Sequence, residues 1–325
     1  VSVNKDPWPK QITELFDTQN GGTVGAWDVT VVKNLGVSGG DGNSETVTGR
    51  TFCNYLSMNM GANFYINPND WGKGLYSTVY VLTDDGYIYK VEFNGMDPFG
   101  FLFFVNNRGL VNSETNTSLY HSARNTVKNN EMKNLKVTLK GGKDIYPVFH
   151  LPNAPDTVLD KTFKIFFEMP ADDLPESIRA TPYLPGKVTD FKFIGISDNS
   201  GCAGDGGFFS FNVTGGSSYQ IKIEFAENYY DDRPANTLYI SNACVPGYNR
   251  VFWDGRDGNG EIVPPGIYSS GESEGTIRVT VQVKAGECHF PLLDAESNPF
   301  GIKVELVNTP YKEDGTLYTW PSEEA

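Results

Sequence analysis

Four stretches of the chain alternate apolar and polar residues with a strict period of two. In residues 219–225, for example, Tyr, Ile, Ile and Phe alternate with Gln, Lys and Glu. Successive side chains of a β-strand point to opposite faces, so this pattern predicts strands with one face on a core and the other in water. Such strands are typical of antiparallel sandwiches, because the strands of doubly wound sheets are apolar on both faces. The same alternation occurs in residues 135–139, 277–284 and 302–306.

Further strands are predicted where aromatic and β-branched residues cluster between turn formers. The sequence TDDG at 83–86 predicts a hairpin turn between two of them. Signals for helices are confined to residues 9–16 and 121–134, and neither stretch has a wide apolar stripe. The additional predicted strands are residues 27–33, 76–82, 87–93, 101–105, 163–167, 188–196 and 208–213.

Two stretches rich in proline and turn-forming residues, 149–163 and 169–186, interrupt the predicted strands. We therefore predict an all-β protein with a β-rich N-terminal domain over residues 1–150. A semi-rigid proline-rich connector over residues 151–186 follows it. Residues 187–325 then form an antiparallel β-sandwich domain.

The charge balance excludes some classes of partner. The chain has 26 basic and 40 acidic residues and a net charge of −14. An acidic surface repels phosphate backbones and anionic lipid heads, so we expect no nucleic-acid partner. The sequence has no apolar run of 18 residues, so we expect no membrane insertion. Acidic surfaces suit calcium-rich extracellular settings, and they equally serve simple solubility.

The stretch VFWDGRDGNGEIVPPGIY, residues 251–268, allows three interpretations. Asp254, Asp257 and Asn259 could form an irregular metal site, although glycines at both ends of the loop rule out an EF-hand. The two aspartates could also be a catalytic pair, but the stretch has no histidine. We favour a structural turn, in which Asp side chains accept hydrogen bonds from backbone N–H groups and glycines supply positive φ angles.

This stretch resembles the W-D-G-x-D-x-x-G-x-x-V-P-x-G-x-Y signature of Ig-like domains of the flagellar-hook-capping type, which occur in bacterial secreted and surface proteins. The resemblance implies an Ig-like sandwich used for assembly or spacing, and it implies no catalytic residue. After the signature, the residues SSGESEG depart from the family pattern, which suggests an insertion before residue 277. Residues 1–150 resemble no family. The matching residues are Trp253, Asp254, Gly255, Asp257, Gly260, Val263, Pro264, Gly266 and Tyr268.

The remaining signals for chemistry are weak. Four cysteines without a C-x-x-C pair argue against zinc and iron–sulfur sites. Cys202 and Cys244, in loops about forty residues apart, form the best candidate disulfide, and the alternative is four ordinary thiols. Ser38 lies at the centre of a G-x-S-x-G pattern, but the residues that follow it cannot begin a long helix, which favours a loop over a nucleophile elbow.

Acidic and aromatic residues gather in several predicted loops. Loop carboxylates are the ligands of extracellular calcium sites, so a structural Ca²⁺ is a possible cofactor, although no ligand set can be assigned. Trp71 and Tyr229 lie in polar loops and could stack on a glycan. The alternative for both aromatic residues is that they anchor the loops to the core.

The sequence therefore predicts a non-catalytic structural or adhesive protein, extracellular and on the bacterial cell surface. It would be a module or subunit of a secreted or surface assembly. Its partners would be other copies or other surface proteins, contacted at edge strands and termini. The alternative is a carbohydrate-binding module or lectin. A glycoside-active enzyme is a third possibility that no spacing of carboxylates supports.

Overall fold

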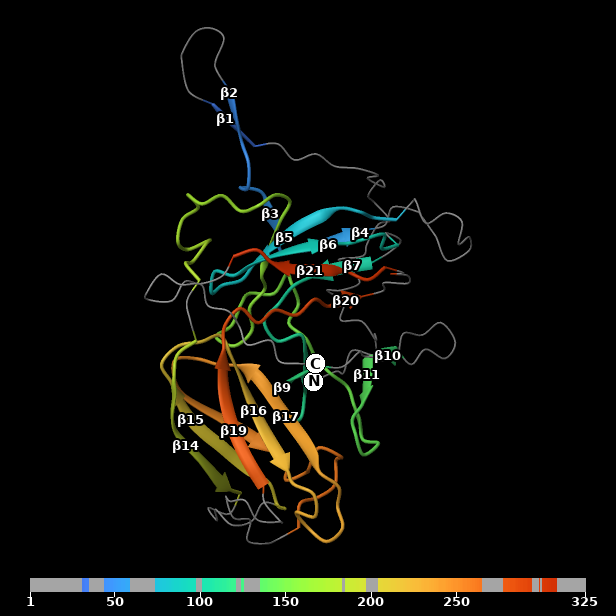
Figure 1. Ribbon diagram of the computed structural model, residues 1–325. Coiled ribbons are helices and arrows are strands. Elements are labelled where there is room, and N and C mark those ends of the chain that lie inside the picture. The colour runs from blue at the N-terminus through green and yellow to red at the C-terminus, as the bar shows by residue number, and fades with distance from the viewer. Residues whose placement is uncertain are drawn as a thin grey trace, which may run out of the picture.

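The computed structural model describes residues 31–34, 44–58, 74–97, 101–120, 124–125, 135–182, 185–196, 204–264, 277–293, 298 and 300–308. These residues form antiparallel sheets, turns and loops without a helix, which confirms the all-β prediction. It follows that no helix in this part of the chain could cross a membrane. The long sheets lie in two groups, one above the other, which we call the upper and lower sandwich (Figure 1).

The upper sandwich encloses a core between a five-stranded and a three-stranded sheet. The five-stranded sheet has the order β21-β6-β5-β13-β3, and the three-stranded sheet has the order β20-β7-β4. Val81, Phe93, Phe103 and Ile165 are fully buried between them. The strands are β3 (Phe52–Cys53), β4 (Tyr55–Met58), β5 (Thr78–Leu82), β6 (Ile88–Glu92), β7 (Phe101–Phe104), β13 (Lys164–Phe166), β20 (Leu292–Leu293) and β21 (Lys303–Leu306).

The lower sandwich packs a three-stranded sheet, β14-β15-β18, against a five-stranded sheet, β19-β16-β17-β9-β8. Its core contains Phe209, Phe211, Ile221, Ile223 and Trp253. The strands are β8 (Leu110–Asn112), β9 (Thr117–Leu119), β14 (Val188–Gly195), β15 (Gly207–Val213), β16 (Ser218–Phe225), β17 (Asn236–Ala243), β18 (Gly247–Trp253) and β19 (Ile277–Lys284). The period-two alternation of β16 accounts for its burial, because every second side chain enters this core.

Five short strands lie outside the sandwiches. β1 (Val31–Asn34) pairs with β2 (Ser44–Val47). β10 (Arg124–Asn125), β11 (Leu135–Thr138) and β12 (Asp144–Ile145) form a small sheet. Two described residues of the stretch 121–134, which we expected to be helical, are thus in a strand. The remainder of that stretch, and residues 9–16, lie outside the described ranges.

The strand pairings cross the boundaries predicted at residues 150 and 187. β9 comes from the N-terminal half of the chain, yet it pairs with β17 of the lower sandwich. β20 and β21 come from the C-terminal end, yet they pair with β7 and β6 of the upper sandwich. The range predicted as a connector instead contributes β13 to the interior of the five-stranded sheet, and Leu174 and Ile178 from the same range pack on the cluster that contains Phe166. The two sandwiches are therefore tied together, because the lower one contains a strand from the N-terminal half of the chain and the upper one contains two strands from the C-terminal end.

The hairpin predicted at 83–86 is present. The N–H of Thr83 donates to the carbonyl of Tyr87 at 2.9 Å, and the N–H of Gly86 donates to the carbonyl of Thr83 at 3.1 Å. Gly86 has φ +88°, a conformation that glycine adopts without steric cost. This turn joins β5 to β6, whose five residues pair in register from Thr78↔Glu92 to Leu82↔Ile88.

Candidate functional site

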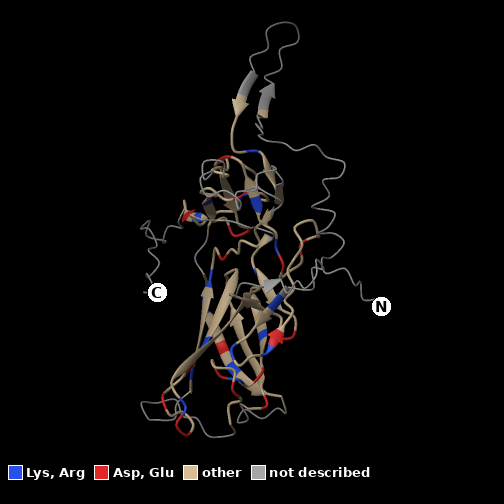
Figure 2. Cartoon of the chain, turned by 90° about the vertical axis from the view of Figure 1, so that its right-hand side faces the viewer, with Lys and Arg blue, Asp and Glu red and all other residues tan. Residues whose placement is uncertain are grey.

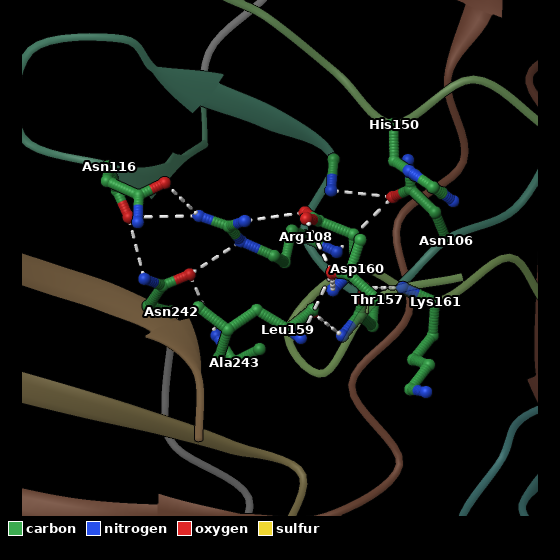
Figure 3. Close-up of polar contacts among 12 residues, drawn as sticks. Asn106, Arg108, Asn116, His150, Thr157, Leu159, Asp160, Lys161, Asn242 and Ala243 are labelled. Carbon is green, nitrogen blue, oxygen red and sulfur yellow. Dashed lines mark hydrogen bonds and ion pairs between the residues drawn. The ribbon is translucent and has the colours of Figure 1, made fainter. Parts of the chain in front are cut away.

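The two sandwiches meet at a polar network centred on Arg108, whose side chain is 5% exposed (Figure 3). Its Nη1 donates to Oδ1 of Asp160 at 2.5 Å, and its Nε donates to Oδ1 of Asn242 at 2.7 Å. Its Nη2 donates to both the side-chain oxygen and the carbonyl of Asn116, at 2.7 and 3.0 Å. The planar guanidinium thus fixes three segments at once: the β8–β9 turn, the loop before β13, and β17.

Neighbouring amides complete this network. Asn242 Nδ2 donates to the carbonyl of Asn116 at 2.7 Å. Asn107 holds the loop that carries Asp160: its Nδ2 donates to the carbonyl of Leu159 at 2.7 Å, and its Oδ1 accepts the N–H of Lys161 at 2.9 Å. Asn116 has φ +56°, a backbone conformation that few residues other than glycine adopt. The contacts from Arg108 and Asn242 hold the turn in that conformation.

Beside this network, a cavity of about 210 Å³ opens at the side of the lower sandwich. One wall is the edge of β18, and the opposite wall is the β8–β9 turn together with the end of β17. Five consecutive residues of β18, 248–252, line it. Side chains alternate between the two faces of a strand, so consecutive residues line one space only where the backbone edge faces it. The lining is Thr115, Asn116, Thr117, Leu159, Tyr219, Asn242, Ala243, Val245, Tyr248, Asn249, Arg250, Val251 and Phe252.

A second polar cluster, around Glu287, lies where the chain returns to the upper sandwich. The hydroxyl of Tyr120 donates to Glu287 Oε1, and Ser218 Oγ donates to Oε2 at 2.7 Å. His289 Nε2 lies 2.9 Å from Oε1, and the backbone of His289 pairs with Asn106. Burial would raise the pKa of the Glu287 carboxyl, but the hydrogen bonds from His289, Tyr120 and Ser218 together hold it below its ordinary value. Glu287 therefore remains charged. It links β16 of the lower sandwich, through Ser218, to the segment that runs from β19 up to β20 of the upper sandwich.

The turn at 254–263, at the far end of the lower sandwich, is organised by Asp257, whose side chain is 1% exposed. Its Oδ1 accepts the N–H groups of Asn259 and Glu261 at 2.9 and 3.0 Å. Its Oδ2 accepts the hydroxyl of Tyr229 at 2.8 Å and Nδ2 of Asn236 at 3.2 Å. Four donors thus surround one buried carboxylate, as the structural interpretation of this stretch expects.

The other described residues of the signature also serve the turn. Trp253 lies in the core, and its Nε1 donates to the carbonyl of Arg256 at 2.8 Å. Asp254 Oδ1 accepts the N–H of Arg256 at 3.2 Å. Gly255 and Gly260 have φ +73° and +84°, and a Cβ on Gly260 would lie 2.4 Å from the carbonyl oxygen of Lys140. Only glycine fits that position, because both the backbone conformation and the space exclude a side chain.

This geometry argues against a metal site or a catalytic pair at Asp254, Asp257 and Asn259. N–H and O–H donors occupy the oxygens of Asp257 that a cation would need, and Asp254 lies in solvent with its side chain 42% exposed. In the described part of the chain, no group of three or more His, Cys, Asp and Glu residues could hold a metal ion. Acidic residues do gather in the loops at this end of the lower sandwich (Figure 2). A structural Ca²⁺ stays a prediction.

The prediction that Tyr229 stands at the surface was wrong. Tyr229 is 3% exposed, its ring packs on Phe225 with centroids 5.0 Å apart, and its hydroxyl donates to Asp257. Arg233 Nη1 donates to the Tyr229 oxygen at 2.8 Å. Burial raises the pKa of Tyr229 to about 12. This aromatic ring therefore anchors its loop to the core, which was the alternative considered for it.

The cysteines give no reactive thiol in the described residues. Cys53, Cys244 and Cys288 are free thiols, and burial raises the pKa of each, to about 11 for Cys53 and about 12 for Cys244. Because the thiolate is the nucleophile, a raised pKa keeps these side chains in the protonated, weakly nucleophilic form at neutral pH. Because Cys244 is a free thiol, the predicted Cys202–Cys244 disulfide is not formed in this structure; Cys202 itself lies outside the described residues.

Some of the predicted residues fall outside the described ranges. Other residues that organise the structure were not predicted at all. Trp71, Ser38, Gly266 and Tyr268 are among the former. The networks around Arg108 and Glu287 were missed, because a single buried charged residue between strands leaves no periodic signal. Their partners are also distant in sequence: Asn242 lies 134 residues from Arg108.

A scan against protein-family models and searches of curated proteins and of solved structures found no match to this chain. The resemblance of residues 251–268 to the flagellar-hook-capping signature therefore rests on the sequence alone.

Proposed function

We propose that this protein is a non-catalytic structural or adhesive subunit, or a module of one, in an extracellular bacterial surface or secreted assembly. One contrast carries the proposal. Asp257, one of the two aspartates considered for metal binding or catalysis, has its carboxylate surrounded by internal donors, whereas the backbone edge of β18 lines a groove.

An exposed strand edge presents unpaired N–H and C=O groups, and another chain can pair with them. The lower sandwich has four edge strands, β14 and β18 in one sheet and β19 and β8 in the other, and they differ in how well they are protected. Val111 of β8 forms a bridge to Val148. β14 carries a bulge between Thr189 and Lys192, with Asp190 at φ +55°, and it lies close to β19. Bulges disrupt the ladder and discourage pairing. β18 pairs with β15 on one side and faces the groove on the other.

Two truncations test the proposal. Removal of residues 1–20 or of residues 310–325 leaves every described strand in place and should abolish assembly while the circular dichroism spectrum stays that of a β protein. Assemblies would be counted by negative-stain microscopy and sized by light scattering. Polymers that stay intact after both truncations would contradict contact through the termini.

Binding of a glycan is the second candidate, and the outer face of the β14–β15–β18 sheet favours it. Tyr248 is 62% exposed, and the rings of Phe208 and Phe252 lie 5.4 Å apart on the same face. The guanidinium of Arg250 lies 3.6 Å from the centroid of the Phe208 ring. Ring faces of this kind contact the C–H groups of sugars. A glycan array that is positive for the protein, and loses signal on Tyr248→Ala but not on the β17 control Tyr239→Ala, would support this function.

A further inference from the structure

The groove beside β18 has the dimensions of a site for one added strand. Its β18 wall is five residues long, which is about 17 Å at the rise of an antiparallel strand. Its volume of about 210 Å³ is enough for an aromatic ring, since a cavity of about 150 Å³ accommodates benzene. Its lining combines apolar side chains, such as Leu159, with aromatic and amide side chains, such as Tyr219 and Asn116.

The walls of this groove are fixed before any partner arrives. Asn249 Nδ2 donates to the carbonyls of Val245 and Gly247, at 2.8 and 3.1 Å, and Oδ1 accepts the N–H of Val245 at 3.2 Å. The Arg108 network holds the opposite wall through Asn116 and Asn242. Pre-formed walls lower the cost of ordering on association, so a short segment can bind there.

One segment of the chain matches the groove in length and chemistry. Residues 316–320, TLYTW, are five consecutive residues of high β propensity, bounded by Gly315 and Pro321, and they lie outside the described ranges. Tyr318 and Trp320 fall on the same face of a strand, and either can supply an aromatic ring.

We propose that residues 316–320 of a second copy of this chain pair with the free edge of β18 and place an aromatic ring in the groove. This inference rests on the proposed function and specifies the contact through which copies assemble. Main-chain hydrogen bonds to β18 would supply affinity, and the ring in the cavity would set the register. β18 would then be an inner strand of a four-stranded sheet.

The test compares the full chain with Tyr318→Pro, because proline removes one ladder donor from the tail and touches no described residue. Glu323→Pro, outside the five-residue segment, is the matched control. Amide hydrogen exchange of residues 247–253 and 277–284 would be followed at several protein concentrations, with sedimentation velocity in parallel. For the full chain and for Glu323→Pro, we expect exchange in 247–253 to slow at least tenfold as concentration rises, with 277–284 unchanged. Tyr318→Pro should lose this protection, and a peptide of residues 315–321 should restore it.

Three results would overturn the proposal. The first is equal exchange of residues 247–253 in the full chain and in Tyr318→Pro, and the second is protection that appears on β19 instead. The third is protection that does not depend on concentration in a monomeric protein, because the tail would then occupy the groove of its own chain. Assemblies that persist in Tyr318→Pro would refute this contact and leave the proposed assembly function standing. If the unaltered chain forms no assemblies at any concentration, the proposed assembly function itself would be refuted.

Discussion

The substitution Asp257→Asn separates a structural role of the 254–263 turn from a metal-binding or catalytic one. The change keeps the size of the side chain but replaces one carboxylate oxygen with an NH₂ group. In either orientation of the amide, two of the four donors around Asp257 face that NH₂ group and lose their acceptor. Each buried donor left without a partner costs about 1–3 kcal/mol. We expect a loss of about 3 kcal/mol in the stability of this turn.

A loss of about 3 kcal/mol corresponds to roughly a 100-fold increase in the local opening equilibrium. Amide hydrogen exchange of residues 251–263 measures that equilibrium directly. Asp254→Asn is the control, because its side chain is 42% exposed and accepts one backbone N–H, so exchange should change less than about fivefold. Equal effects of the two substitutions would refute the structural reasoning. So would an effect of Asp257→Asn that appears only in the presence of calcium.

Three further predictions concern other parts of the molecule. Gly260→Ala should lower the free energy of unfolding, measured in urea, by more than about 2 kcal/mol, because the added Cβ would clash with backbone atoms. Gly247→Ala has open space around it and should lower that free energy by about 1 kcal/mol, for its positive φ alone. Arg108→Lys should lower the melting temperature by several degrees, since an ammonium group cannot replace a fork that bonds three partners; an unchanged melting temperature in scanning calorimetry would argue against a structural network. The pKa of Glu287 in the folded protein lies below its unfolded value of about 4.3, so its contribution to stability is present above that value and is lost as the pH falls through the folded pKa. Glu287→Gln should therefore flatten the dependence of the unfolding free energy on pH below about pH 4.5. The control Glu261→Gln, at an exposed side chain, should leave that dependence unchanged.

The strands were predictable because their signal is local. Residues 219–225 and 277–283 alternate strictly, and the structure pairs β16 with β19 along their whole length. The turn at 83–86 and the interpretation of Asp257 as a structural carboxylate also followed from short-range chemistry. In each case, the predictive signal came from residues that are neighbours in the sequence, although Tyr229 and Asn236 supply two further donors to Asp257 from 28 and 21 residues away.

The arrangement of the strands was not predictable from the same patterns. The pairing of β9 with β17 and of β21 with β6 joins segments more than 100 residues apart, and alternation says nothing about which strands are neighbours. The prediction that Tyr229 is exposed was wrong for a related reason. Its loop is polar in sequence, but the hydroxyl finds a buried carboxylate 28 residues away, so a side chain that looks exposed is part of the core.

The groove beside β18 was also invisible in the sequence. It exists because the β8–β9 turn, held by Arg108, stands opposite the edge of a strand more than 130 residues further along the chain. Edge strands could be anticipated in general from a sandwich fold, whereas the identity of the open edge depends on which strands protect the others. In the lower sandwich, β14 and β19 lie together on one side, and the groove lies beside β18 on the other.

The most direct test of a structural, assembling protein is the association state of the purified chain, measured by multi-angle light scattering and negative-stain microscopy, in calcium and in EDTA. We predict filaments, sheets or oligomers of defined size whose fraction rises with protein concentration. A monodisperse monomer in both conditions, at all concentrations tested, would contradict the proposed function and direct the search to ligand binding on the outer face of the β14–β15–β18 sheet.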